Sequence, residues 1–210
     1  MNCRPFVITL SHQLGSGAAY LGQHLSERLA IPCVDREILY QVSKQLNMAE
    51  AELAGREQRL SSFWQSFARI VELMDPAQSL TSGDHYVPTD KELFQLESDT
   101  IGRIAKESSA IFIGRCGRYI LRNHPCQISV LVHADRPSRA QRLAALYHLT
   151  LEEAEKLTVT NDRERAAYIQ TFTRQNWLDA RLYDVCLNTS SLGLDQAIEL
   201  ILACAKAKNS

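Results

Sequence analysis

The residues best suited to chemistry begin with a glycine-bearing segment, SHQLGSGAA, at positions 11–19. An apolar run at residues 6–10 precedes it, and Leu21, Leu25 and Leu29 follow it at helical spacing. A strand, a glycine turn and a helix in this order direct backbone N–H groups and a helix N-terminus at one point, which favours an anion such as phosphate. The segment is therefore predicted to be a phosphate-binding loop.

Charged side chains, most of them arginines, follow the other apolar runs. A guanidinium group suits phosphate because its planar fork donates parallel hydrogen bonds to two oxygens. In an open α/β sheet, ligands bind beyond the carboxyl ends of the strands. We therefore expect one rim, facing a phosphorylated ligand, that collects Asp35, Arg36, Arg115, Arg118, Arg139, Arg142, Arg163 and Arg165.

Some members of this rim have a simpler interpretation. Arg118 and Arg142 suit a solvated helix face better than a ligand contact. Arg115 is better placed, because it directly follows an apolar run and a glycine. Asp35 fits a substrate contact and the N-cap of a following helix equally well.

The sequence predicts no metal site. Asp135 follows an apolar run, but Pro137 two residues later favours an N-cap over a metal ligand. The histidines, including His12 and His133, lack metal-ligand spacing and are interpreted as structural.

Five short apolar runs, separated by helical patterns, predict an α/β fold with a parallel sheet. They lie at residues 6–10, 31–34, 110–113, 128–133 and 185–187. Helices are expected at residues 36–46, 47–74 and 89–107, after a capping box at Thr150 and Glu153, and from Leu194 onward. Residues 75–88 are turn-rich, and this length suggests a lid or binding loop.

The overall composition excludes several classes of protein. The 210 residues include 23 Lys+Arg and 24 Asp+Glu, and this balance argues against a general nucleic-acid or membrane surface. No apolar run approaches the roughly 20 residues that cross a bilayer, and no signal-peptide pattern begins the chain. Six scattered cysteines are expected to be free thiols, which favours a cytoplasmic location. The oligomeric state is left open.

The order of these segments, over about residues 6–205, resembles the cytidylate kinase-like family of P-loop nucleoside-monophosphate kinases. The stretches that carry the resemblance are ITLSHQLGSG, IPCVDREIL, FIGRCGRYIL, VHADRPSRAQRL, LTLEEAEKL, NDRERAAYIQTFT, and Trp177 followed by YDVCLNTSSLGLDQAIELI.

The resemblance implies a single domain with a five-stranded parallel P-loop core, a monophosphate-binding helical insert within residues 47–92 and a lid at about residues 150–182. The implied reaction moves the γ-phosphoryl group of ATP onto CMP, dCMP or a related acceptor, with Mg²⁺. By position, the phosphate loop contains Ser11, Gly15, Ser16, Gly17, Ala18 and Ala19. The acceptor side contains Asp35, Arg36, Arg115 and Arg118. The lid contains Asp162, Arg163 and Arg165, and catalytic roles fall to Arg115, Arg163 and Arg165.

The loop departs from the family pattern at its cations. The family usually has arginine where this chain has His12, and GSGGR where it has GSGAA. A Walker A lysine would fall at Ala18 or, with one inserted residue, at Ala19. Two functions therefore stay open. One is a kinase whose arginines replace the loop cation. The other is a catalytically weak or inactive relative that binds a nucleotide or another small phosphorylated ligand as a regulatory or interaction protein.

Overall fold

A five-stranded parallel sheet forms the centre of the protein. The computed structural model describes residues 5–35 and 90–209. The sheet order is β2-β3-β1-β4-β5. The strands are β1 (Val7–His12), β2 (Cys33–Val34), β3 (Ala110–Ile113), β4 (Gln127–His133) and β5 (Val185–Asn188). All four strand pairings are parallel, so the carboxyl ends of the strands share one edge. The predicted α/β fold is confirmed.

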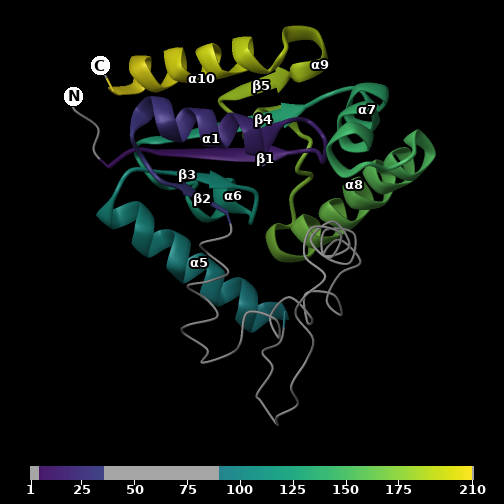
Figure 1. Cartoon of the computed structure of the whole chain (residues 1–210). Helices are drawn as coiled ribbons and strands as arrows, with labels where there is room; N and C mark the ends of the chain where they lie inside the picture. Colours follow the sequence, from purple (N-terminus) through teal and green to yellow (C-terminus); the bar gives the residue numbers. More distant parts are fainter. Residues whose placement is uncertain (1–4, 36–89, 210) are drawn as a thin grey trace, which may run out of the picture.

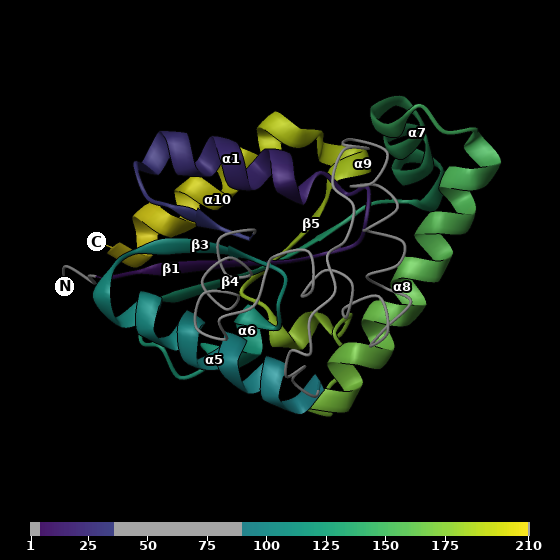
Figure 2. The ribbon, with the colours of Figure 1, turned by 60° about the horizontal axis from the view of Figure 1, so that its bottom comes forward.

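Helices cover both faces of this sheet (Figures 1 and 2). On one face lie α1 (Ala18–Leu29) and α10 (Leu194–Asn209), and on the other lie α5 (Asp90–Glu107) and the short α6 (Gly117–Ile120). The helices α7 (Arg136–Tyr147) and α8 (Leu151–Thr173) pack together beyond the carboxyl edge. A 3-10 turn, η1 (Ala180–Leu182), precedes β5, and α9 (Thr189–Leu192) follows it.

Alternating strand residues build a separate apolar core on each face. Ile8 packs with Leu21 and Ile201 in the cluster beneath α1 and α10. Val7 belongs to the opposite cluster with Phe112, beneath α5. Burial on both faces explains why β1, β3 and β4 were visible as continuous apolar runs in the sequence. It also holds the loops that follow β1 and β3 in fixed positions.

The expected helix starts are confirmed where the structure describes them. Asp135 Oδ1 accepts a hydrogen bond from the Ser138 backbone N–H at 2.7 Å, which makes it the N-cap of α7. Thr150 and Glu153 form the predicted capping box of α8. The charged residues 160–165 lie inside this helix, so the spacing of their side chains follows the helical period.

Several predictions fall on residues outside the described ranges. They include Arg36, the helices expected at residues 36–46 and 47–74, and the loop at residues 75–88. None of the helices in residues 90–209 or 5–35 combines the length and apolar character needed to cross a membrane.

The expectation that every cysteine is a free thiol is wrong at Cys126, which takes part in a disulfide bond. Cys33, Cys116, Cys186 and Cys204 are free. The sequence could not reveal this bond, because pairing depends on which cysteines the fold brings together and not on their spacing.

Candidate functional site

The predicted phosphate loop joins the carboxyl end of β1 to α1. Gly15 and Gly17 have φ angles of +80° and +91°, in the left-handed region that favours glycine. A Cβ atom on Gly15 would lie 2.7 Å from the carbonyl oxygen of Arg139, and one on Gly17 would collide with Leu194. No side chain caps the first turn of α1. Its backbone N–H groups are therefore directed into the loop, as an anion site requires.

Ser16 supplies a further mark of an anion site. Its hydroxyl is buried and has no hydrogen-bond partner among the described residues. Leaving a buried hydroxyl without a partner is costly, and a phosphate oxygen would provide the missing acceptor. The loop residues thus fit the phosphate groups of a nucleotide.

The structure separates the two alanines that replace the loop cation. Ala18 is buried at 2% exposure in the core beneath α1, whereas Ala19 is exposed on the first helical turn. A cation reaching a phosphate from this turn would therefore have to stand at position 19.

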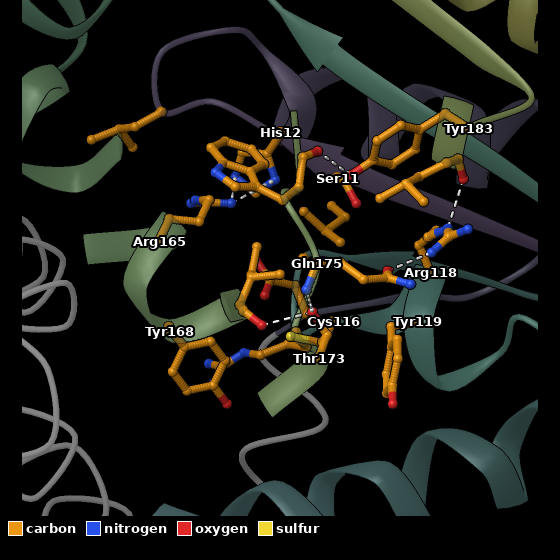
Figure 3. A pocket seen from close by; sticks show the side chains of 18 residues that line it. Ser11, His12, Cys116, Arg118, Tyr119, Arg165, Tyr168, Thr173, Gln175 and Tyr183 are labelled. Carbon is orange, nitrogen blue, oxygen red and sulfur yellow. Dashed lines mark hydrogen bonds between the residues drawn. The ribbon is translucent and has the colours of Figure 1, made fainter. Parts of the chain in front are cut away.

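A pocket lies at the same carboxyl edge, beside the loop (Figure 3). Its wall comes from the ends of β1 and β3, from the residue after β2, from α8 and from the segment that leads to β5. The predicted site residues in this wall are Ser11, Asp35, Arg115, Arg118 and Arg165. The structure therefore brings together residues that are up to 154 positions apart in the sequence (165 − 11).

Arg165 lies against His12 at the junction of the pocket and the loop (Figure 3). Its Nη1 is 3.4 Å from both ring nitrogens of His12, and its guanidinium lies 5.7 Å from the Trp177 ring centroid. Burial, assisted by the charge of Arg165, holds the pKa of His12 well below its usual value. Burial also lowers the pKa of Arg165 to about 10. A neutral imidazole therefore faces a charged guanidinium, and His12, interpreted from the sequence as structural, is part of the pocket wall.

Arg115 forms a buried ion pair behind the pocket. Its Nη1 lies 2.8 Å from Glu97 Oε1, and the two side chains are 6% and 1% exposed. Gly114, Arg115 and Cys116 all have left-handed backbone angles, which makes a tight turn after β3. Burial and the Glu97 charge raise the pKa of the Cys116 thiol to about 12. The charge of Arg115 is thus balanced by a carboxylate before any ligand binds.

The solvated-face interpretation is wrong for Arg118 and Arg142. Arg118 Nε donates to the Leu182 carbonyl at 2.6 Å, and its Nη1 donates to Gln175 Oε1 at 2.8 Å. Arg142 donates to the hydroxyl and carbonyl oxygens of Thr189 at 2.9 and 2.8 Å. Both arginines therefore tie helices to distant segments, and Arg118 does so from inside the pocket wall.

Arg139 and Asp162 form a second paired group, between α7 and α8. Arg139 Nη1 and Nη2 donate to the two carboxylate oxygens of Asp162 at 3.0 and 2.9 Å, and Nη1 also reaches the Leu14 carbonyl at 3.3 Å. Gln13 Nε2 donates to Asp162 at 3.2 Å. Arg163 differs from these residues, since it is exposed and absent from the pocket wall. The structure thus separates Arg163 from Arg165, which the sequence had grouped.

Sequence reasoning missed most of the pocket's far wall. Tyr168 and Thr173 come from α8, and Gln175, Trp177 and Tyr183 follow it. Trp177 was visible as part of a quoted motif, but nothing in its spacing assigned it to a pocket. These residues form a wall because α8 ends at Thr173 and the chain turns back toward β5.

Within residues 5–35 and 90–209, no three His, Cys, Asp or Glu side chains lie together as a metal site requires. The hydroxyl that contacts magnesium in a P-loop directly follows the lysine, and the residues after positions 18 and 19 are Ala19 and Tyr20. Neither an aliphatic side chain nor a phenol that hydrogen bonds Asp195 provides that ligand.

Taken together, a glycine loop between the first strand and its helix, a parallel sheet in this order and a pocket at the shared edge define a protein of the P-loop kinase fold. Residues 7–191 match the cytidylate kinase-like family. The chain belongs to this family, as its motifs predicted. A comparison with curated proteins finds no match.

Solved structures share the fold. An uncharacterized protein from Eubacterium ventriosum has a TM-score of 0.70 at 19% identity, covering 96% of this chain and 98% of that chain. A shikimate kinase from Bacteroides thetaiotaomicron has a TM-score of 0.54 at 10% identity, covering 96% and 98% of the two chains. The shikimate kinase from Acinetobacter baumannii in complex with shikimate has a TM-score of 0.51 at 12% identity, covering 98% and 95%. At these identities the likeness establishes the fold alone.

Proposed function

We propose that the protein transfers the γ-phosphoryl group of ATP to a nucleoside monophosphate, CMP or dCMP. Membership in a kinase-like family supports phosphoryl transfer as the general class of reaction. The observation that carries the proposal is the shared position of loop and pocket. Ser11 and His12 end β1 and line the pocket, and Gly15, the first glycine of the loop, follows three residues after His12. A donor phosphate on the loop would therefore meet an acceptor in the pocket.

In this proposal the residues divide the work between the two substrates. The loop N–H groups and Ser16 bind the donor phosphates, and Arg165 neutralises charge on the group in transfer. Asp35, Arg115 and Arg118 bind the acceptor. Arg36 and Arg163 stay predictions for the acceptor side and the lid, because the first lies outside the described residues and the second is exposed.

The proposed cofactors are ATP and Mg²⁺. Magnesium commonly binds through substrate phosphates and keeps several of its waters, so it needs few protein ligands. The absence of a carboxylate cluster in the described residues is compatible with magnesium entering on the nucleotide. Bound in that way, the ion would neutralise phosphate charge, and the chain itself would orient the two substrates.

A second candidate is a catalytically weak or inactive relative that binds nucleotide for a regulatory or interaction role. Two observations favour it. Ala19 provides no charge where a loop cation would reach the β- and γ-phosphates. Arg115, one of the proposed catalytic arginines, is already paired with Glu97. Loss of a transition-state cation typically costs orders of magnitude in rate.

Steady-state kinetics separate these candidates. ADP formation from ATP and Mg²⁺ is measured with a panel of nucleoside monophosphates. We expect turnover with CMP or dCMP, and a fall of about 100-fold or more in kcat for Arg165→Met. Arg103→Met, an exposed change on α5, is the matched control and keeps the wild-type rate. Nucleotide binding without turnover of any acceptor would reject the kinase activity and support the catalytically inactive, nucleotide-binding relative.

A small phosphorylated molecule is the proposed partner, and neither nucleic acid nor membrane is expected. A cytoplasmic location stays a prediction that suits the use of ATP, although the disulfide at Cys126 is unusual for that compartment.

A further inference from the structure

Four aromatic residues line the pocket, and its wall also includes the side-chain amide of Gln175. They are Tyr119, Tyr168 and Tyr183, together with Trp177, whose ring lies against Arg165. The rings belong to α6, to α8 and to the segment before β5, so they line more than one side (Figure 3). Aromatic side chains of this kind bind planar rings by stacking. They provide few hydrogen-bond partners for an acceptor that carries many hydroxyl groups.

Arg118 fixes the polar group, which is the side-chain amide of Gln175. Arginine has only hydrogen-bond donors, so the amide oxygen of Gln175, and not its nitrogen, must face Arg118 Nη1. Arg118 is itself held by the Leu182 carbonyl and lies 5.9 Å from the Tyr183 ring centroid. The orientation of the amide is therefore set by its partner.

The backbone also holds Gln175 in place. Its N–H donates to Thr173 Oγ1 at 3.2 Å, and that hydroxyl donates to the Ile169 carbonyl at 2.7 Å. The end of α8 thus positions the residue. With Oε1 on Arg118, the NH₂ group is the end left for a ligand, and it has no acceptor among the residues that the structure describes.

The neighbouring aromatic residues are held by hydrogen bonds of their own. The Tyr183 hydroxyl donates to the Trp177 carbonyl at 2.6 Å, and it is also hydrogen bonded to the Ser11 side chain (Figure 3). A preformed wall loses little conformational entropy when a ligand binds, so its few polar groups can discriminate between ligands.

We propose that this pocket binds the planar base of the acceptor nucleotide, and that Gln175 is a specificity-determining residue whose Nε2 donates to an acceptor atom on the edge of that base. The inference rests on the proposed function, since it takes the acceptor to be a nucleotide. Arg165 and His12 lie on the other side of the pocket from Arg118 and Tyr183 (Figure 3), which places the phosphate of the same ligand toward the loop.

The test is equilibrium binding by isothermal titration calorimetry, with CMP and ribose 5-phosphate as probes. Ribose 5-phosphate lacks the base, so wild-type protein should bind CMP at least about tenfold more tightly. Gln175→Glu keeps an oxygen for Arg118 but replaces the donor with an acceptor. This variant should weaken CMP by about tenfold or more and leave ribose 5-phosphate within about twofold. Gln196→Glu, the same change on an exposed position of α10, should leave both affinities unchanged.

Several results would overturn the inference. One is equal wild-type affinity for the two probes, and another is no binding of CMP. Parallel weakening of both probes in Gln175→Glu would show a general structural role. The wild-type comparison stands even if the variant fails to fold. Turnover of CMP without any preference for the base would reject this inference but support the proposed kinase activity. Base-dependent binding without turnover would support this inference but reject the kinase activity.

Discussion

The ion pair between Arg139 and Asp162 should stabilise the fold, although the sequence placed Asp162 among ligand-binding lid residues. Asp162→Asn keeps the shape but removes the charge and turns an amide toward the guanidinium. Arg139 is 4% exposed and Asp162 24% exposed. Breaking a buried pair costs about 3–5 kcal/mol, and partial exposure of Asp162 favours the lower end. We expect a loss of about 3 kcal/mol, which for a chain of this size lowers Tm by about 6–12 °C.

Thermal and urea unfolding without any ligand measure this effect. Glu199→Gln is the matched control, because Glu199 pairs with Arg28 at 2.9 Å but both side chains are more than half exposed. It should cost at most about 1 kcal/mol. If Asp162→Asn unfolds no more readily than Glu199→Gln, the pair does not stabilise the junction of α7 and α8. If it weakens only ligand binding, the original lid interpretation is correct.

Three further predictions concern the loop and its neighbours. His12 has a folded-state pKa well below its usual 6.5, so the unfolded state binds more protons below that pH. The contribution of His12 to the free energy of unfolding should be fully present above about pH 6.5 and should fall as the pH drops, by at most about 1.4 kcal/mol per pH unit. Urea unfolding at several pH values measures this slope, and His12→Asn should remove it. Gly15→Ala should cost about 2–4 kcal/mol, from its left-handed backbone and its contact with Arg139, and differential scanning calorimetry measures it. Ala19→Arg should tighten ATP binding by about tenfold in calorimetric titrations, since it adds a charge-assisted hydrogen bond.

Each of these predictions has a control within the chain. His148 is exposed, and His148→Asn is the matched control for His12→Asn. Gly102 has open space around its missing Cβ, so Gly102→Ala should raise stability by about 1 kcal/mol. Ala203→Arg adds the same charge on α10, far from the loop, and should not change ATP affinity. Each prediction is rejected if its control variant shows the same effect. The effects are the lost pH slope of stability for His12→Asn, the lower stability for Gly15→Ala and the tighter ATP binding for Ala19→Arg.

The fold was predictable because its determinants are local. Strands buried on both faces appear as apolar runs in the sequence. The capping residues Asp135 and Thr150 accept hydrogen bonds from backbone N–H groups only three residues later. The phosphate loop was predictable for the same reason. Gly15 and Gly17 carry the left-handed angles that their positions in the turn suggested.

The pocket was only partly predictable, because its contacts join residues that are far apart. Arg118 looked like a surface residue until Leu182, 64 positions later, supplied its acceptor. Arg163 and Arg165 looked equivalent in a charged segment. On a helix, two positions differ by about 200° around the axis, so one points into the pocket and the other to solvent. Which of the two faces inward depends on how α8 packs, and the short charged segment does not determine that.

We propose that phosphoryl transfer to a nucleotide takes place at the carboxyl edge of the sheet, between the phosphate loop and the pocket. Its most direct measurement is the appearance of labelled CDP when the protein is incubated with γ-labelled ATP, Mg²⁺ and CMP. We predict labelled CDP in amounts that exceed the enzyme concentration, with a strong reduction in Arg165→Met. Saturating binding of both nucleotides with no labelled CDP, even after long incubation, would contradict the claim.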